Sequence, residues 1–198
     1  MTTGVAVTLA STSAIRTQLL RAAGVAFETA SPGVDEEALK AELITHGAFP
    51  PEVAAALADA KAVAVSGVGI VIGADQTLDF HGHLLDKAQT LAEARERLKA
   101  LRGKSHRLHS AVAAAVGGEV VWRDLASATL HMRSFSDAWL EAYLERNEAA
   151  ALSSVGCYQL EGEGVQLFDR VEGDYFAILG MPLVHLLEFL RRRGALAT

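Results

Sequence analysis

The sequence predicts an α/β fold built on a mixed sheet, and two observations support this prediction. Segments with strand character and segments with helix character alternate along most of the 198 residues. In the middle, two long strand patterns at 106–118 and 119–133 are joined by a Gly-Gly-Glu turn, which indicates an antiparallel hairpin. Alternation favours parallel pairs and the hairpin adds antiparallel ones, so neither a purely doubly wound sheet nor a barrel is expected.

In the first half, apolar β-rich stretches predict strands and capping residues delimit helices. A helix at 11–24 begins with serine and threonine and stops at Gly24. A helix at 34–43 has acidic residues at its start, where the helix dipole favours them, and one at 50–67 has proline in its first turn. The strands are expected at 5–10, 25–30 and 68–77.

In the second half, the clearest helix spans 90–103, with Thr90 and Glu93 at capping-box spacing and Gly103 as its stop. Ser136 is the expected N-cap of a helix at 136–147. The C-terminal part predicts short strands at 165–173 and 176–180, followed by an amphipathic helix at 182–194.

Composition limits the classes of function. The net charge of −6 and the pI of about 5.6 argue against a general surface for polymeric nucleic acid, which needs a basic face. The single cysteine, Cys157, excludes an internal disulfide or a cysteine-based zinc site, and a buried thiol is expected there. The N-terminal stretch lacks the features of a signal peptide, and no apolar run reaches membrane-spanning length. We expect a cytoplasmic protein with no membrane partner.

The histidines of the His-Gly-His sequence, His81 and His83, are interpreted as a polar hairpin tip because no third metal ligand follows nearby. The Gly-rich run at 67–73 lacks the glycine spacing of a dinucleotide fingerprint and lies inside a strand pattern.

A lone carboxylate, Asp75, ends the apolar strand at 68–77. The hydroxyl-rich stretch 11–13 follows the first strand in the same way, and ligands of open α/β sheets gather beyond the carboxyl ends of strands. Hydroxyls, amides and a helix N-terminus would bind an anion, with Arg16 adding charge. Lys61, Lys87 and a second carboxylate, Glu36, would complete a pocket for a polyphosphate and a divalent cation. Taken singly, each residue is better explained as a solvated charge, a helix start or a turn.

The order of these residues resembles the Maf family of nucleoside triphosphate pyrophosphatases. The stretch LASTSAIRTQLL is similar to the family pattern LASxSxRRxxLL, and VIGADQTL is similar to xxGADTxV. Further similar stretches run almost to the end of the chain: SPGVDEE, ALADAKA, LLDKAQTLAEARERLKALRGKSH, SVGCYQLEGEG and GDYFAILGMPLVHLLEFL.

The resemblance implies one Maf-like domain over residues 1–198, an elongated, two-lobed mixed sheet flanked by helices with the active cleft between the lobes, like inosine triphosphatases. It implies release of diphosphate from a nucleoside triphosphate, a magnesium or manganese cofactor, and a possible homodimer. By position, Asp75 would be the general base and would hold the metal together with Glu36. The implied substrate-binding residues are Ser11, Ile15, Arg16, Lys61, Gln76, Lys87 and Glu161.

Several positions depart from the family pattern. Ile15 replaces an arginine, Gln76 a threonine and Glu161 a glutamine, while Ser153 and Ser154 replace an Asp-Lys pair. In the resemblance, glutamine and glutamate at these positions are typical of the 7-methyl-GTP branch, whose tryptophan is missing here. A carboxylate such as Glu161 accepts hydrogen bonds from the N1–H and amino group of a guanine.

Three functions are therefore compatible with the sequence. The first is a metal-dependent pyrophosphatase that prefers 7-methyl-GTP or another purine nucleotide. The second is a broad-range enzyme or one directed to dTTP and UTP. The third is a nucleotide-binding regulator of division with weak catalysis.

Overall fold

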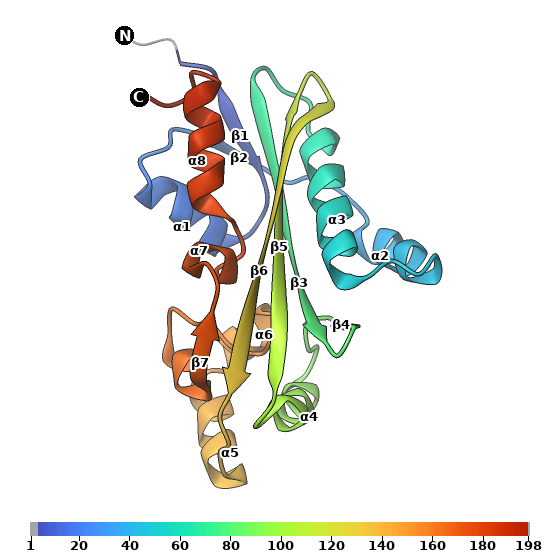
Figure 1. Cartoon of the computed structure of the whole chain (residues 1–198), viewed down its shortest axis with the longest axis vertical. Coiled ribbons are helices and arrows are strands. Elements are labelled where there is room, and N and C mark those ends of the chain that lie inside the picture. Colours follow the sequence, from blue (N-terminus) through green and yellow to red (C-terminus); the bar gives the residue numbers. More distant parts are fainter. Residues whose placement is uncertain (1–3, 198) are drawn as a thin grey trace.

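Three long strands form the spine of the computed structural model, which describes residues 4–197 (Figure 1). They are β3 (Ile70–Phe80), β5 (Ser105–Val116) and β6 (Glu119–Met132), and β5 pairs antiparallel with both of the others. The turn between β5 and β6 falls at Gly117 and Gly118, which both have a positive φ. The hairpin predicted from the sequence is confirmed.

The shorter strands make the sheet mixed. Strand β1 (Val7–Ala10) runs parallel to β3 on one side and to β2 (Glu28–Ala30) on the other. Strands β4 (His83–Leu85) and β7 (Phe168–Glu172) pair antiparallel with β3 and β6. The sheet order is β2-β1-β3-β5-β6-β7, with β4 beside β3. The predicted α/β class with a mixed sheet is confirmed. Of the two histidines predicted at a hairpin tip, His81 lies in the turn between β3 and β4 with Gly82, and His83 is the first residue of β4.

The pairing of β3 with its neighbours is interrupted along one edge, and this gap in the pairing forms the site described below. Strand β1 pairs with β3 only as far as Gly73, and β4 begins to pair with it at Leu78. Both lie on the side of β3 opposite to β5, which pairs continuously along this stretch. Residues 74–77 therefore have an open flank, and the chain that leaves the carboxyl end of β1 passes beside it.

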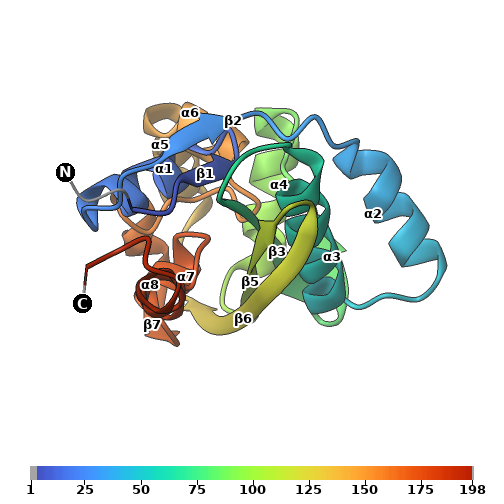
Figure 2. The same ribbon diagram turned by 90° about the horizontal axis from the view of Figure 1, so that it is seen from above.

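Helices cover both faces of the sheet (Figures 1 and 2). They are α1 (Ala14–Ala22), α2 (Glu36–Thr45), α3 (Pro50–Ala64), α4 (Leu91–Leu101), α5 (Asp137–Arg146), α6 (Glu148–Ser153), the 3₁₀ helix η1 (Glu163–Leu167), α7 (Tyr175–Ile178) and α8 (Leu183–Arg192).

Helix α3 lies unusually close to the sheet. Its buried alanines pack against alanines of β5, and a Cβ built on Gly73 would lie 2.2 Å from the carbonyl oxygen of Ala58. Only glycine fits at this position of β3. Because of this close approach, Lys61 in the last turn of α3 is buried against the sheet.

The buried apolar side chains form two main clusters. One joins α1 and α8 to β1 and β3, and includes Leu9, Leu20 and Leu186. The other joins α4, α5 and the far ends of β5 and β6, and includes Leu98 and Tyr143. A single domain with two lobes stays a prediction, and the two clusters are consistent with it.

The C-terminal part contains the main errors of the sequence prediction. The segment 176–180, predicted as a strand, forms helix α7 and its end, because Asp174 caps the helix through the amide of Ala177 at 2.8 Å. The strand predicted at 165–173 is a 3₁₀ helix up to Leu167 and a strand only afterwards. Helix α6 was not predicted.

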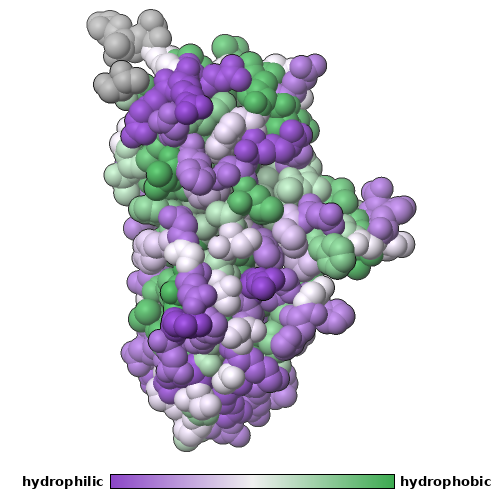
Figure 3. Space-filling model, in the orientation of Figure 1, coloured by the Kyte–Doolittle hydropathy of each residue, from purple (hydrophilic) through white to green (hydrophobic). Residues whose placement is uncertain are grey.

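Helix α2 projects from the side of the molecule (Figures 1 and 2), and none of its residues is buried. The surface in Figure 3 shows this projection with hydrophobic and hydrophilic side chains intermixed. Among the described residues, no helix has the length and apolar character needed to cross a bilayer.

Candidate active site

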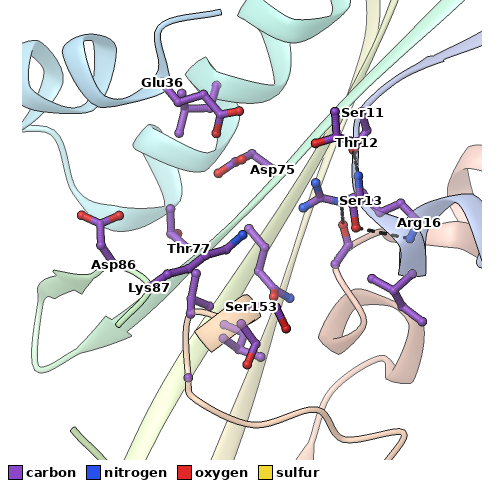
Figure 4. Close-up of a pocket in the computed structure, with 18 of the residues that line it drawn as sticks. Ser11, Thr12, Ser13, Arg16, Glu36, Asp75, Thr77, Asp86, Lys87 and Ser153 are labelled. Atoms are coloured by element: carbon purple, nitrogen blue, oxygen red, sulfur yellow. Dashed lines mark hydrogen bonds between the residues drawn. The ribbon is translucent and has the colours of Figure 1, made fainter. Parts of the chain in front are cut away.

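The open flank of β3 forms the floor of a cleft of about 700 Å³. Its walls come from the loop after β1, the start of α2, α3, the loop after β4, and the segments after α6 and α7 (Figure 4). Every candidate predicted from the sequence lines it: Ser11, Ile15, Arg16, Glu36, Lys61, Asp75, Gln76, Lys87 and Glu161. Ser153 and Ser154 line it as well.

Two carboxylates converge on one ammonium group in the cleft. The Nζ of Lys61 lies 2.7 Å from Oδ1 of Asp75 and 2.9 Å from Oε2 of Glu36. Lys61 and Asp75 are 5% and 8% exposed, whereas the Glu36 side chain is 42% exposed. Figure 4 shows Glu36 and Asp75 pointing toward one another. Both carboxylates therefore face the same point of the cleft.

The loop after β1 forms a polar wall opposite these carboxylates (Figure 4). Ser13 caps α1 by accepting from the amide of Arg16, and Ser11 accepts from the amide of Ser13 at 3.2 Å. Arg16 is buried, and its Nε donates to the carbonyl of Gly180 at 2.9 Å. Burial lowers the pKa of Arg16, although Asp75 and Glu36 oppose this shift. A guanidinium stays charged at neutral pH, so this wall presents a fixed cation.

Gln76 connects the floor of the cleft to helix α7. Its Nε2 lies 3.0 Å from the carbonyl oxygen of Ala177, 2.9 Å from that of Ile178, and 2.9 Å from Oγ of Ser110. Ser110 in turn donates to Ala177 at 2.6 Å. Because the amide nitrogen is occupied by acceptors, the remaining group of this side chain is its oxygen, an acceptor.

The remaining candidates lie on the rim. Lys87 and Glu161 are exposed, and Ile15 belongs to α1. Lys87 reaches toward the middle of the cleft in Figure 4, with Ser153 near it. Glu161 lies in the segment between α6 and η1 and contributes a carboxylate to the lining at this end of the cleft.

Sequence reasoning missed a second ion-pair cluster at the mouth of the cleft. Lys40 of α2 contacts Glu37 at 2.6 Å and Asp86, in the loop after β4, at 2.5 Å. These contacts raise the pKa of Lys40 despite the opposing effect of partial burial, which is the largest single influence. A local signal existed, because Lys40 follows Glu37 by three residues, a spacing that places both on the same face of α2.

The donor chemistry of Glu36 and Asp75 fits a magnesium or manganese ion. Magnesium prefers one or two carboxylates, with its other positions filled by water and substrate phosphates. Among residues 4–197 there is no cluster of three or more His, Cys, Asp or Glu side chains that would form a complete protein cage. The two carboxylates therefore suit a metal that arrives with a phosphate ligand.

Comparison with known proteins agrees with this arrangement. The family model for the Maf-like proteins matches residues 6–193 of the chain. The chain belongs to the Maf family. This Maf-like chain is 60% identical over 192 residues to a protein of Caulobacter vibrioides named nucleoside triphosphate pyrophosphatase, and the match covers 96% of each.

Two further relatives carry different names. A protein of Rhizobium meliloti named 7-methyl-GTP pyrophosphatase is 46% identical to this Maf-like chain over 95% of its residues and 96% of the relative. A protein of Granulibacter bethesdensis named nucleoside triphosphate pyrophosphatase is 47% identical, over 95% of this chain and 97% of the relative. Relatives of both names thus match nearly the whole chain.

Proposed function

We propose that this protein is a nucleoside triphosphate pyrophosphatase, which uses water to split a nucleoside triphosphate into a nucleoside monophosphate and diphosphate. The observation that carries the proposal is the convergence of Asp75 and Glu36 on Lys61, facing the arginine and hydroxyl wall of one cleft. The names of the relatives support the same activity.

In this proposal Asp75 is the general base. Its carboxylate accepts a proton from a water molecule, whose oxygen attacks the α-phosphorus while the bond to the bridging α–β oxygen breaks and diphosphate leaves. Lys61 donates a hydrogen bond to the Asp75 carboxylate, and strand β3 holds Asp75 in place. Asp75 and Glu36 would hold the divalent metal, which would offset negative charge on the phosphates.

The other cations would bind the triphosphate. Arg16 and the amides at the start of α1 face the cleft from the carboxyl end of β1, a favourable position for phosphate oxygens. Lys87 is exposed at the rim and free to follow the leaving diphosphate. Lys61 was predicted to bind phosphate. Because its ammonium is already bonded to both carboxylates, we propose that it acts on the phosphates indirectly, by orienting those carboxylates.

For the base, we propose a preference for 7-methyl-GTP or another purine nucleotide. Glu161 supplies an acceptor for the N1–H and amino group of a guanine, and the Gln76 oxygen is a second acceptor. Ile15 offers an apolar contact but no aromatic stacking surface. Since free nucleotides are the proposed substrates, we expect the protein to act in the cytoplasm, and a homodimer stays a prediction.

The test is diphosphate release from a panel of 7-methyl-GTP, GTP, UTP and dTTP, with magnesium, with manganese and with chelator. We expect turnover that requires the metal and is fastest with a guanine nucleotide. Comparable rates for dTTP and 7-methyl-GTP would favour the broad-range alternative. Tight nucleotide binding without turnover in any metal would favour a nucleotide-binding regulator and refute the enzyme.

A further inference from the structure

The segment 154–162, here called the rim loop, carries Glu161 and much of one wall of the cleft. Its bonds from backbone to backbone are short-range turns, such as those from Cys157 to Ser154 and from Gly162 to Gln159, both 3.2 Å. Two of its carbonyls accept from distant side chains, that of Val155 from Arg97 at 3.0 Å and that of Cys157 from Tyr143 at 3.3 Å. Such turns do not by themselves fix the loop against the sheet. Its position relative to the cleft must therefore come from side chains that anchor it.

Tyr158 connects the rim loop to the sheet. It is 5% exposed, and its hydroxyl lies 2.6 Å from Nε2 of His106 on β5, which is 2% exposed. The Tyr158 ring packs edge-on against Phe168 at 4.7 Å between centroids. The loop thus inserts one aromatic side chain into the core, where a single short hydrogen bond holds its end.

Two glycines show how tightly the chain wraps this ring. A Cβ built on Gly156 would lie 2.2 Å from a ring carbon of Tyr158, and one built on Gly164 would lie 2.9 Å from the Tyr158 Cβ. The backbone on both sides therefore follows the ring closely. A displacement of Tyr158 would be passed to the residues beside it, including Gln159 and Glu161.

His106 places a polar ring at a buried position that an apolar side chain of similar size could fill. Burial lowers the pKa of His106 to about 4, so the ring is neutral at physiological pH, and its Nδ1 is buried without a hydrogen-bond partner among the described residues. A buried polar atom without a partner is costly, and an apolar pair of similar shape would avoid that cost. We infer that a histidine is needed here for its hydrogen bond to Tyr158, and not only to fill space in the core.

We propose that His106 and Tyr158 are a positioning pair that fixes the rim loop, and through it Glu161, at the base end of the cleft, and so determines which nucleobase is accepted. This inference rests on the proposed pyrophosphatase function and deepens it. His106 lies outside the cleft lining, and Tyr158, which contributes to that lining, has its hydroxyl bonded to His106. The loop at the start of α1, which would bind phosphate, is a separate wall of the cleft. Loss of the hydrogen bond between His106 and Tyr158 should therefore weaken recognition of the base and leave binding of the triphosphate unchanged.

The chain offers closely matched variants for the experiment. Tyr158→Phe keeps the ring and removes the hydroxyl, and His106→Gln removes the imidazole from the other side. His109→Gln is the control, since His109 is a buried histidine of the same strand whose partners are Ser127 and Asp79. All variants are first compared with the parent protein by circular dichroism and thermal unfolding, and either test variant that folds is sufficient.

The measurements are kcat and KM for 7-methyl-GTP, GTP, UTP and dTTP, and competitive inhibition by inorganic tripolyphosphate, which has no base. We expect both test variants to reduce the ratio of kcat/KM between the best and the poorest nucleotide by about five- to tenfold, mainly through KM, the range expected for one hydrogen bond. The inhibition constant of tripolyphosphate should stay within about twofold of the parent value. His109→Gln should keep the parental ratio.

Other outcomes would overturn the inference. An unchanged nucleotide ratio in a folded variant would show that the bond does not position the loop. An equal loss for every nucleotide, together with weaker inhibition by tripolyphosphate, would show a merely structural role. If the parent turns over no nucleotide, the proposed function fails separately, and the same ratio is then measured as binding of the four monophosphates by calorimetry. Absence of any selective binding by the parent would refute both.

Discussion

Lys61 and Asp75 lie fourteen residues apart, yet their side chains meet at 2.7 Å on the floor of the cleft. Lys61 lies in the last turn of α3. The prediction that Asp75 ends its strand is wrong, because β3 continues to Phe80 and Asp75 lies in its middle. The close contact between α3 and β3 at Gly73 brings the two residues together. This pair, with Glu36 as a third member, is the electrostatic centre of the candidate site, and most of the predictions below concern it.

The first prediction concerns the proposed general base. Asp75→Asn keeps the size and the contact with Lys61 but cannot accept the proton, so kcat should fall by at least about a hundredfold. Nucleotide affinity measured by calorimetry should change little. Asp79→Asn is the control, because Asp79 lies on the same strand but outside the cleft lining, where it accepts from the amide of Gly82. Parental turnover by Asp75→Asn would remove the assigned role.

The second prediction concerns the charge balance. Lys61→Met leaves two adjacent carboxylates without their shared ammonium, and breaking a buried ion pair in this way costs about 3 kcal/mol of folding free energy, the low end of the usual range because Glu36 is partly exposed. Urea unfolding measures this cost. Lys99→Met, which removes an exposed pair with Glu96, should change stability by less than about 1 kcal/mol. Equal effects of the two substitutions would contradict a central role for Lys61.

The third prediction concerns the metal. If Glu36 is a ligand, Glu36→Gln should raise the magnesium concentration needed for half-maximal turnover by about tenfold or more, because a charged ligand becomes a neutral one. Glu42→Gln, on the same helix but outside the cleft lining, should behave like the parent. A titration of magnesium at fixed nucleotide makes the comparison. Coincident curves for Glu36→Gln and the parent would exclude Glu36 as a ligand.

The fourth prediction concerns pH. The folded protein protonates His106 only near a pKa of about 4, whereas the unfolded chain does so near 6.5. Below pH 6.5 the unfolded state therefore binds more protons, and stability is lost as the pH falls from 6.5 toward 4. His106→Gln should remove about 3 kcal/mol of this loss. Denaturant unfolding of both proteins across this range tests it, and parallel pH profiles would show that His106 is not responsible.

The fifth prediction concerns the contact between α3 and the sheet. Gly73→Ala places a methyl group 2.2 Å from the Ala58 carbonyl oxygen, which the backbone can relieve only by moving the helix. We expect a stability loss of about 1–3 kcal/mol and a lower kcat, because Lys61 moves with the helix. Gly67→Ala, whose added Cβ has no neighbour closer than 3.9 Å, should have little effect on either.

The sequence predicted the sheet class, the central hairpin and most helices because these depend on local patterns. Thr90 and Ser136, for example, cap α4 and α5 as their spacing indicates. The prediction for segment 176–180 was wrong because its composition favours a strand. Its helical structure depends on the Asp174 cap and on Gln76, about a hundred residues away, whose side chain donates to the carbonyls of the helix. No local pattern contains that information.

The members of the candidate site were found through the order of motifs, and their partners were not. Lys61 was expected to bind phosphate, but its bonds to both carboxylates depend on the depth at which α3 packs. The anchoring of Tyr158 by His106 joins residues 52 positions apart and has no sequence signature. Contacts of this kind are set by the tertiary fold, and only a structure shows them.

The chain has two tryptophans, and each belongs to a different apolar cluster. Trp122 stacks on Phe189 of α8, whereas Trp139 stacks on Tyr143 within α5. Each half of the molecule therefore carries its own intrinsic fluorophore. Replacing one tryptophan at a time by phenylalanine would let the emission of the other report the melting of its own half, and superimposable transitions would identify the two halves as one cooperative unit.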